Sequence, residues 1–319
     1  MHVARGVPAP SGAPDAPGAH AAGVGWVPPR WSWGLLPALL ACLAAPAFFV
    51  LQRSWLGWTL LVVALIGAWL CGRGAGRGSG GVAHARRAAA SIDAGARAAR
   101  PPSLLRDLSL IAVGLGIVSL IPLHAELDNL AFVRFTLALG GAVAAPYLVS
   151  RLGYRDRAIG FPWRGGRRWT AFQWGWLVGV LALGWLILPF YFITSGVYAN
   201  WPVVDTPELI ARLFVGVGAV GIWDELFFIC TVFALLRRHF PMWQANILQA
   251  IVFVSFLWEL GYQAWGPLLT IPFALLQGFI FMRTRSLGYV VTVHLLFDAV
   301  VFSVLVHAHN PGLLPFFLV

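Results

Sequence analysis

The feature that most constrains this chain is its succession of apolar runs, each about as long as a membrane crossing. A helix needs roughly 20 apolar residues to cross the ~30 Å hydrocarbon core of a bilayer, because each residue advances it by about 1.5 Å. On this criterion we expect about nine spans, near residues 33–51, 55–71, 108–124, 130–149, 170–193, 209–236, 243–262, 266–282 and 286–306. The sequence therefore predicts an all-α fold, a polytopic transmembrane helical bundle.

The composition argues against a water-soluble domain. Of the 319 residues, 11% are charged and 59% are hydrophobic, whereas soluble domains carry about 25% charged residues. A formal net charge of +10 is also common in nucleic-acid-binding proteins, but here the basic residues lie in short loops between apolar runs, so we expect no nucleic acid as a partner. The cysteines Cys42, Cys71 and Cys230 lie in or beside apolar runs and form no CxxC pair, which indicates small core residues.

The basic residues, all of them arginines, predict the orientation. They cluster in 72–107, in 150–169, at 237–238 and at 283–285. The alternate loops carry acids: Glu126 and Asp128 in one, Asp205 and Glu208 in the other. Positively charged loops stay in the cytoplasm, and nine spans with a cytoplasmic N-terminus place all four arginine clusters on that side. We expect a multi-pass protein of the bacterial inner (plasma) membrane.

The same pattern divides the chain into segments. Residues 1–32 are rich in Pro, Ala and Gly and are expected to be a disordered tail. An N-terminal transmembrane hairpin, 33–71, follows, and then an Arg/Gly/Ala-rich cytoplasmic linker, 72–107, that would lie on anionic lipid headgroups. The remaining spans form a transmembrane domain, 108–319, whose chemistry-bearing residues fall within 209–306.

Ionisable side chains inside these spans are the candidate functional residues, because placing them in hydrocarbon is costly. They are Asp224 and Glu225 in the sixth span, Glu259 in the seventh, and His294 and Asp298 in the ninth. His294 and Asp298 are four residues apart and share a helix face. At about 1.5 Å per residue, Glu225, His294 and Asp298 reach similar depths, whereas Glu259 lies nearer the outer face. We expect all five side chains to converge on one cavity.

The order and spacing of these residues resemble the superfamily of type II CAAX prenyl proteases and bacteriocin-processing enzymes (CPBP), which are intramembrane glutamic proteases. The family carries EExxxR, FxxxH and HxxxN or HxxxD on successive buried helices. The corresponding segments here are Asp224-Glu225-Leu-Phe-Phe-Ile229, Ser255-Phe-Leu-Trp-Glu259 and His294-Leu-Leu-Phe-Asp298. Asp224 replaces the first Glu, Ile229 replaces the Arg, and Glu259 replaces the His. The related PrsW-type membrane proteases carry FxxxE and HxxxD, which match Glu259 and Asp298.

The resemblance implies an intramembrane endopeptidase that hydrolyses a peptide bond in a membrane-embedded or lipidated protein. It implies that Asp224 or Glu225 is the general base for a water molecule, with Glu259 sharing a proton. His294 and Asp298 would hold the water or the tetrahedral oxygen. Carboxylates this close in a low dielectric cannot all ionise, which produces the paired acid and base that such chemistry needs.

Two other functions remain open on the sequence. A relative that has lost the motif Arg and His could bind membrane partners without catalysis. A proton-coupled transporter could use Asp224, Glu225 and Glu259 as a relay. The motifs imply no cofactor, and a divalent metal stays open because four carboxylates and one histidine form an oxygen-rich ligand set.

Overall fold

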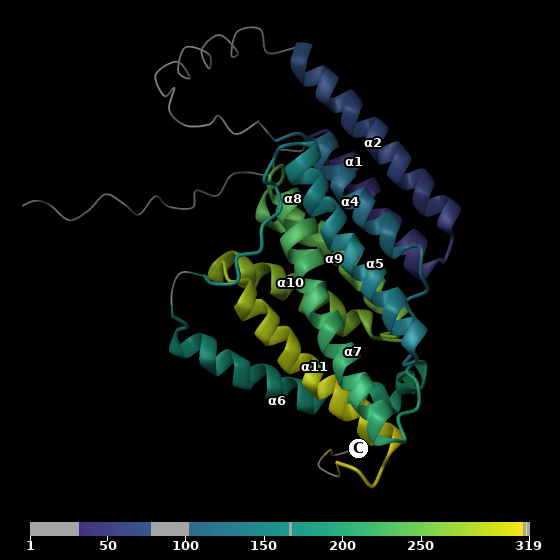
Figure 1. Cartoon of the computed structure of the whole chain (residues 1–319). Coiled ribbons are helices and arrows are strands. Elements are labelled where there is room, and N and C mark those ends of the chain that lie inside the picture. The colour runs from purple at the N-terminus through teal and green to yellow at the C-terminus, as the bar shows by residue number, and fades with distance from the viewer. Residues whose placement is uncertain (1–31, 78–101, 166–167, 315–316, 318–319) are drawn as a thin grey trace, which may run out of the picture. The chain divides into compact units, whose positions relative to one another are not determined.

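A computed structural model describes residues 32–77, 102–165, 168–314 and 317 of the chain, and this part is helical throughout (Figure 1). The expected N-terminal tail, 1–32, lies almost wholly outside the described residues, as does the central part of the expected linker, 72–107. The four arginines Arg86, Arg87, Arg97 and Arg100 of that linker are among the residues not described.

Nine long helical segments follow one another in the described residues, and each overlaps one predicted span. Three of them include a stretch of π-helix, here labelled η. The elements are α1 (Leu35–Ala45) with η1 (Pro46–Val50), α2 (Ser54–Arg77), α4 (Leu104–Val118), α5 (Asn129–Leu148) with η2 (Val149–Gly153), α6 (Ala171–Thr194), the short 3-10 turn η3 (Val197–Asn200), α7 (Pro207–Asp224) with η4 (Glu225–Phe233) and α8 (Ala234–Arg237), α9 (Met242–Leu260), α10 (Pro267–Thr284) and α11 (Leu287–His309).

Six of these segments are long and apolar enough to cross a membrane. They are Ser54–Arg73, Asn129–Gly153, Ala171–Thr194, Pro207–Arg237, Pro267–Thr284 and Leu287–His309. The other three are shorter or more polar: Leu35–Val50, the 15-residue α4 and α9, whose buried face carries Gln244, Asn246 and Gln249. The predicted fold class, a polytopic helical bundle, is confirmed.

The N-terminal hairpin packs on the rest of the bundle through its aromatic side chains. Phe49 of η1 meets Phe256 of α9 edge to face, with ring centroids 6.4 Å apart. Trp58 of α2 covers Gly116 of α4, where a Cβ atom would collide with the indole ring. These contacts hold the hairpin of α1, η1 and α2 against α4 and α9 (Figure 1).

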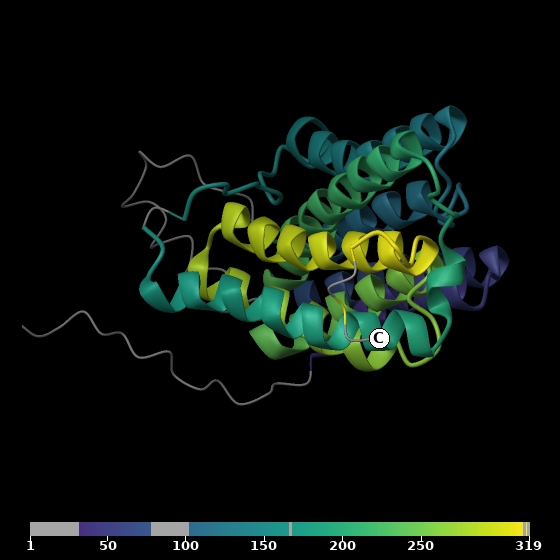
Figure 2. The same ribbon diagram turned by 90° about the horizontal axis from the view of Figure 1, so that it is seen from below.

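The helices α6 and α11 run side by side (Figure 1 and Figure 2). Tyr289, at the start of α11, donates a hydrogen bond to the Gln173 carbonyl at the start of α6 over 2.8 Å. On its other side α11 packs against α7, because Gly221 leaves room there: a Cβ atom at Gly221 would overlap Asp298. The two helices can therefore approach closely at the level of the buried acids.

An ion-pair cluster fixes the end of α8. Arg238 donates to Asp107 of α4 over 2.8 Å and to Asp156, which follows η2, over 2.7 Å. His239 lies 2.7 Å from the second Asp107 oxygen. Charged pairs of this geometry tie together elements that are far apart in the sequence.

Candidate functional site

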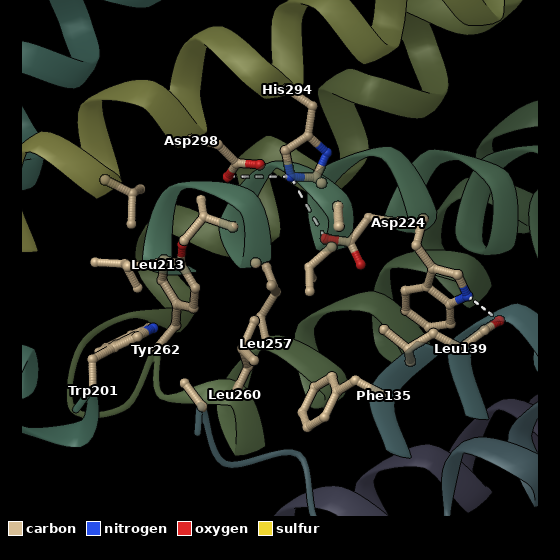
Figure 3. A pocket seen from close by; sticks show the side chains of 18 of the residues that line it. Phe135, Leu139, Trp201, Leu213, Asp224, Leu257, Leu260, Tyr262, His294 and Asp298 are labelled. Carbon is tan, nitrogen blue, oxygen red and sulfur yellow. Dashed lines mark hydrogen bonds and ion pairs between the residues drawn. The ribbon is translucent and has the colours of Figure 1, made fainter. Parts of the chain in front are cut away.

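His294 is the centre of a buried cluster that contains three of the predicted acids. Its Nδ1 lies 2.7 Å from Glu225 Oε1. Its Nε2 lies 3.6 Å from Asp224 Oδ2 and 3.8 Å from Asp298 Oδ1. All four side chains are at most 9% exposed. Figure 3 shows Asp224 and Asp298 directed at the same edge of the imidazole ring.

Two local features of the chain place these side chains together. On α11, the four-residue spacing puts His294 and Asp298 on one face, as the sequence predicted. In the helix that carries the first motif, α7 changes to the π-helix η4 between Asp224 and Glu225. Such π-stretches are rare and are frequent at functional sites. Here the two adjacent acids contact different nitrogens of the same histidine.

Gln277 of α10 joins this cluster and was missed by the sequence reasoning. Its Nε2 donates to Glu225 Oε1 over 2.7 Å and to the Val290 carbonyl over 3.3 Å. Glu225 Oε1 is therefore held between an imidazole and an amide. The sequence reasoning considered only ionisable groups inside spans, but a fully buried glutamine in an apolar helix also needs partners. That rule could have found Gln277.

Three carboxylate oxygens in the cluster have no hydrogen-bond partner among the described residues: Asp224 Oδ1, Glu225 Oε2 and Asp298 Oδ2. Buried polar atoms are almost always hydrogen-bonded in folded proteins. A cluster that leaves this many acceptors open is suited to bind a donor such as water or a peptide N–H.

A cavity of about 330 Å³ reaches the cluster. Asp224, His294 and Asp298 line it, while Glu225 lies behind His294 and does not. Most of the other lining residues are apolar side chains of α5, α7 and α11, which include Phe135, Leu213 and Phe297. The volume falls in the range of about 300–1,000 Å³ that is typical of ligand pockets.

Glu259 does not join the cluster, and this corrects the expectation that all five residues converge. Its Oε1 accepts a hydrogen bond from the Leu123 backbone N–H over 3.4 Å, and it does not line the cavity. Leu257 lines the cavity instead. Two residues further along a helix is a rotation of about 200°, so Glu259 points the opposite way.

The face of α9 that meets the site is therefore apolar. The Phe253 ring lies 6.0 Å from the His294 ring, between centroids, and Leu257 follows four residues later. These two positions present an F-x-x-x-L pattern toward the site, with leucine where the FxxxH motif has histidine. On the motif helix, Ile229 is fully buried where the family has arginine. In the described chain, no group of three or more His, Cys, Asp and Glu side chains is arranged to hold a metal ion.

Residues 206–300 match the family model described as Type II CAAX prenyl endopeptidase Rce1-like. The resemblance to the CPBP superfamily is confirmed. The matched residues run from the start of α7 into α11 and contain all five predicted site residues as well as Gln277. This family is one of proteases. The match therefore supports a hydrolase activity in general, in a multi-pass membrane protein. No curated protein and no solved structure matches the chain.

Proposed function

We propose that the chain is an intramembrane endopeptidase that uses a water molecule to cleave a membrane-embedded or lipidated protein. The observation that carries the proposal is the buried cluster in which one histidine contacts three carboxylates at the inner end of an apolar cavity. A site of this kind costs folding free energy, because burying charges is unfavourable unless they are fully paired. Its open acceptor atoms favour a chemical role over a packing role.

The positions of the side chains support a separate role for each residue. Asp224 lines the cavity and has a free oxygen, so it is the proposed general base. Glu225 is held by His294 and Gln277 behind the cavity wall and is proposed to orient the imidazole. With Glu225 bonded to Nδ1, His294 directs Nε2 toward Asp224 and Asp298.

The proposed reaction begins with a water molecule between Asp224 and His294 Nε2. Asp224 takes one proton from the water as its oxygen forms a bond to the peptide carbonyl carbon. His294, as an imidazolium, donates a hydrogen bond from Nε2–H to the oxyanion. Asp224 then gives its proton to the amide nitrogen as the C–N bond breaks, which leaves a carboxyl terminus and a free amine. Asp298 stabilises the imidazolium.

A lateral opening supports a substrate that arrives through the bilayer. Among the residues that line the cavity, Thr136 and Gly140 of α5 and Ala219 of α7 are exposed at mid-helix. Surface at that level of a spanning helix faces lipid. An apolar substrate segment can therefore enter between α5 and α7 without crossing water.

The apolar residues Ile229 and Leu257, where the family has a cation and a histidine, favour a second candidate function. On that alternative the chain binds membrane partners in the cavity and does not cleave them. One experiment decides between the two.

The experiment is to express the chain in a host membrane and to compare the new protein N-termini that appear with wild type and with variants. We expect cleavage fragments with wild type that disappear with Asp224→Asn and with His294→Ala. Glu208→Gln, at an exposed acid outside the cavity, is the matched control and should leave the fragments unchanged. If the wild-type protein is folded but produces no cleavage fragments, partner binding is the function that remains.

A further inference from the structure

The cavity lies in one half of the bundle, and that half can be identified. On α5 its lining runs from Ala131 to Gly140, and on α7 it runs from Leu213 to Asp224. From α9 and α10 it takes only the ends that flank the 261–266 loop, and from α11 it takes residues between His294 and Val301. These segments adjoin the loops 124–129, 194–206 and 261–266, so the cavity extends from the cluster toward that end alone.

The two ends of the bundle differ in charge. At the far end, arginines lie in the last turn of α8 and α10 or just after η2, α8 and α10: Arg155, Arg157, Arg237, Arg238, Arg283 and Arg285. At the cavity end, the loops before α5 and α7 carry acids. Arg134 and Arg212 lie near that end, but each is paired with an acid, Glu126 at 2.8 Å and Glu208 at 3.0 Å respectively.

Asp128 is a further negative charge at the cavity end. It caps α5 by accepting hydrogen bonds from the backbone N–H groups of Leu130 and Ala131. The hydrogen bond from Ala131 holds the pKa of Asp128 below its usual value. The loop that carries it also forms part of the cavity wall, through Ala125, Glu126 and Leu127.

Arg212 fastens this loop to α7. Its guanidinium donates to the Leu127 carbonyl over 3.1 Å and to Asn129 Oδ1 over 2.8 Å. The loop therefore has a fixed position over the cavity, with Glu126 exposed at the rim. A substrate can therefore enter the site through the lateral gap between α5 and α7, or over the rim at Glu126 at the acid-bearing end.

Arginine-rich loops remain in the cytoplasm, so the cavity end faces the opposite side. We propose that the site opens to the extracytoplasmic side and takes an apolar, bilayer-anchored protein segment whose cleavable bond lies in the outer half of the membrane. This rests on the proposed function for the cleavage itself. A substrate whose only accessible bond lies in a cytoplasmic tail would not reach Asp224, because the arginine-bearing halves of the helices close the cavity below it.

The test uses single cysteines and a charged, membrane-impermeant methanethiosulfonate, which requires no catalytic activity. Cys42, Cys71 and Cys230 are first replaced by alanine. Val217→Cys, on the cavity wall, is compared with Val215→Cys, which is exposed on the same helix but faces away from the cavity. Val220→Cys is a second cavity position, and Arg155→Cys reports on the arginine-bearing face. A thermal unfolding scan establishes that each variant is folded.

We expect the reagent to modify Val217→Cys and Val220→Cys when it is added outside intact cells, and Arg155→Cys only in inverted vesicles. Val215→Cys should resist both treatments, because a thiol in lipid does not ionise. Modification of the cavity cysteines only from the cytoplasmic side, from which Arg155→Cys reacts, overturns the proposal. Protection of the cavity cysteines from the reagent on both sides also overturns it. Loss of proteolysis with this labelling pattern intact would instead count against the proposed function alone.

Discussion

Two clusters in this molecule both combine a histidine with carboxylates, and they differ in how well their charges are matched. At the end of α8, Arg238 pairs with Asp107 and Asp156, and His239 takes the second oxygen of Asp107. Both oxygens of Asp107 and Oδ2 of Asp156 therefore have a partner. Around His294, three carboxylates share one imidazole and leave three oxygens unpaired.

The difference separates a cluster that holds the fold from one that is available for chemistry. A compensated ion-pair network stabilises the elements it joins, whereas an under-compensated one costs stability and persists where it has a function. We make four predictions from this difference, beginning with the substitution that should change the protein most.

The first prediction concerns Asp224. Asp224→Asn should lower the cleavage rate by about 10³-fold, because general acid–base catalysis contributes about 10²–10⁴. The melting temperature should stay the same or rise, since the substitution removes a buried charge. Single-turnover cleavage and a thermal scan on the same preparation check both. A variant that loses activity only because it unfolds would show that the cluster is structural.

The second prediction concerns Arg238. Arg238→Met should destabilise the fold by about 2 kcal/mol, because it removes the cation that is hydrogen-bonded to the buried Asp107 and the partly buried Asp156. Activity per folded molecule should be retained. The measurement is the unfolding free energy in detergent, with Arg157→Met as the control on the same face. Equal stability of the two variants would contradict the structural role of this cluster.

The third prediction concerns Gln277. Gln277→Leu should reduce kcat about tenfold, the cost of one lost hydrogen bond to a charged group, and leave KM unchanged, because Gln277 contacts Glu225 and not the cavity. Gln249→Leu is the matched control: this amide bonds to the Ala274 carbonyl and Asn246, away from the cluster. If both variants lower Tm equally and neither changes kcat, Gln277 only supports packing.

The smallest effect is expected at Glu259. Glu259→Gln should change the cleavage rate less than about twofold, because its side chain accepts a hydrogen bond from the Leu123 N–H outside the cavity, and the glutamine oxygen can accept the same bond. The same cleavage assay checks this, with Asp224→Asn beside it. A loss as large as that of Asp224→Asn would return Glu259 to the site.

The helices were predictable from sequence because their apolar runs are long, although only six of the nine are long and apolar enough to cross a membrane. The pairing of His294 with Asp298 followed from helical spacing alone. Glu259 was assigned wrongly to the cluster because an apolar helix offers several motif registers, and only packing shows that Phe253 and Leu257 face His294. Gln277 and the direction of the cavity depend on contacts between helices distant in sequence. The π-helix at Glu225 is also a tertiary outcome that hydrophobic periodicity does not reveal.

The central claim is that the His294 cluster hydrolyses a peptide bond, and oxygen labelling tests it most directly. Membranes that contain the chain are incubated in H₂¹⁸O, and the new C-termini are analysed by mass spectrometry. With wild type we expect fragments whose new carboxylate carries one ¹⁸O atom. With Asp224→Asn or His294→Ala we expect no such fragments. Labelled fragments that form equally with Asp224→Asn, or a folded wild type that forms none, would contradict it.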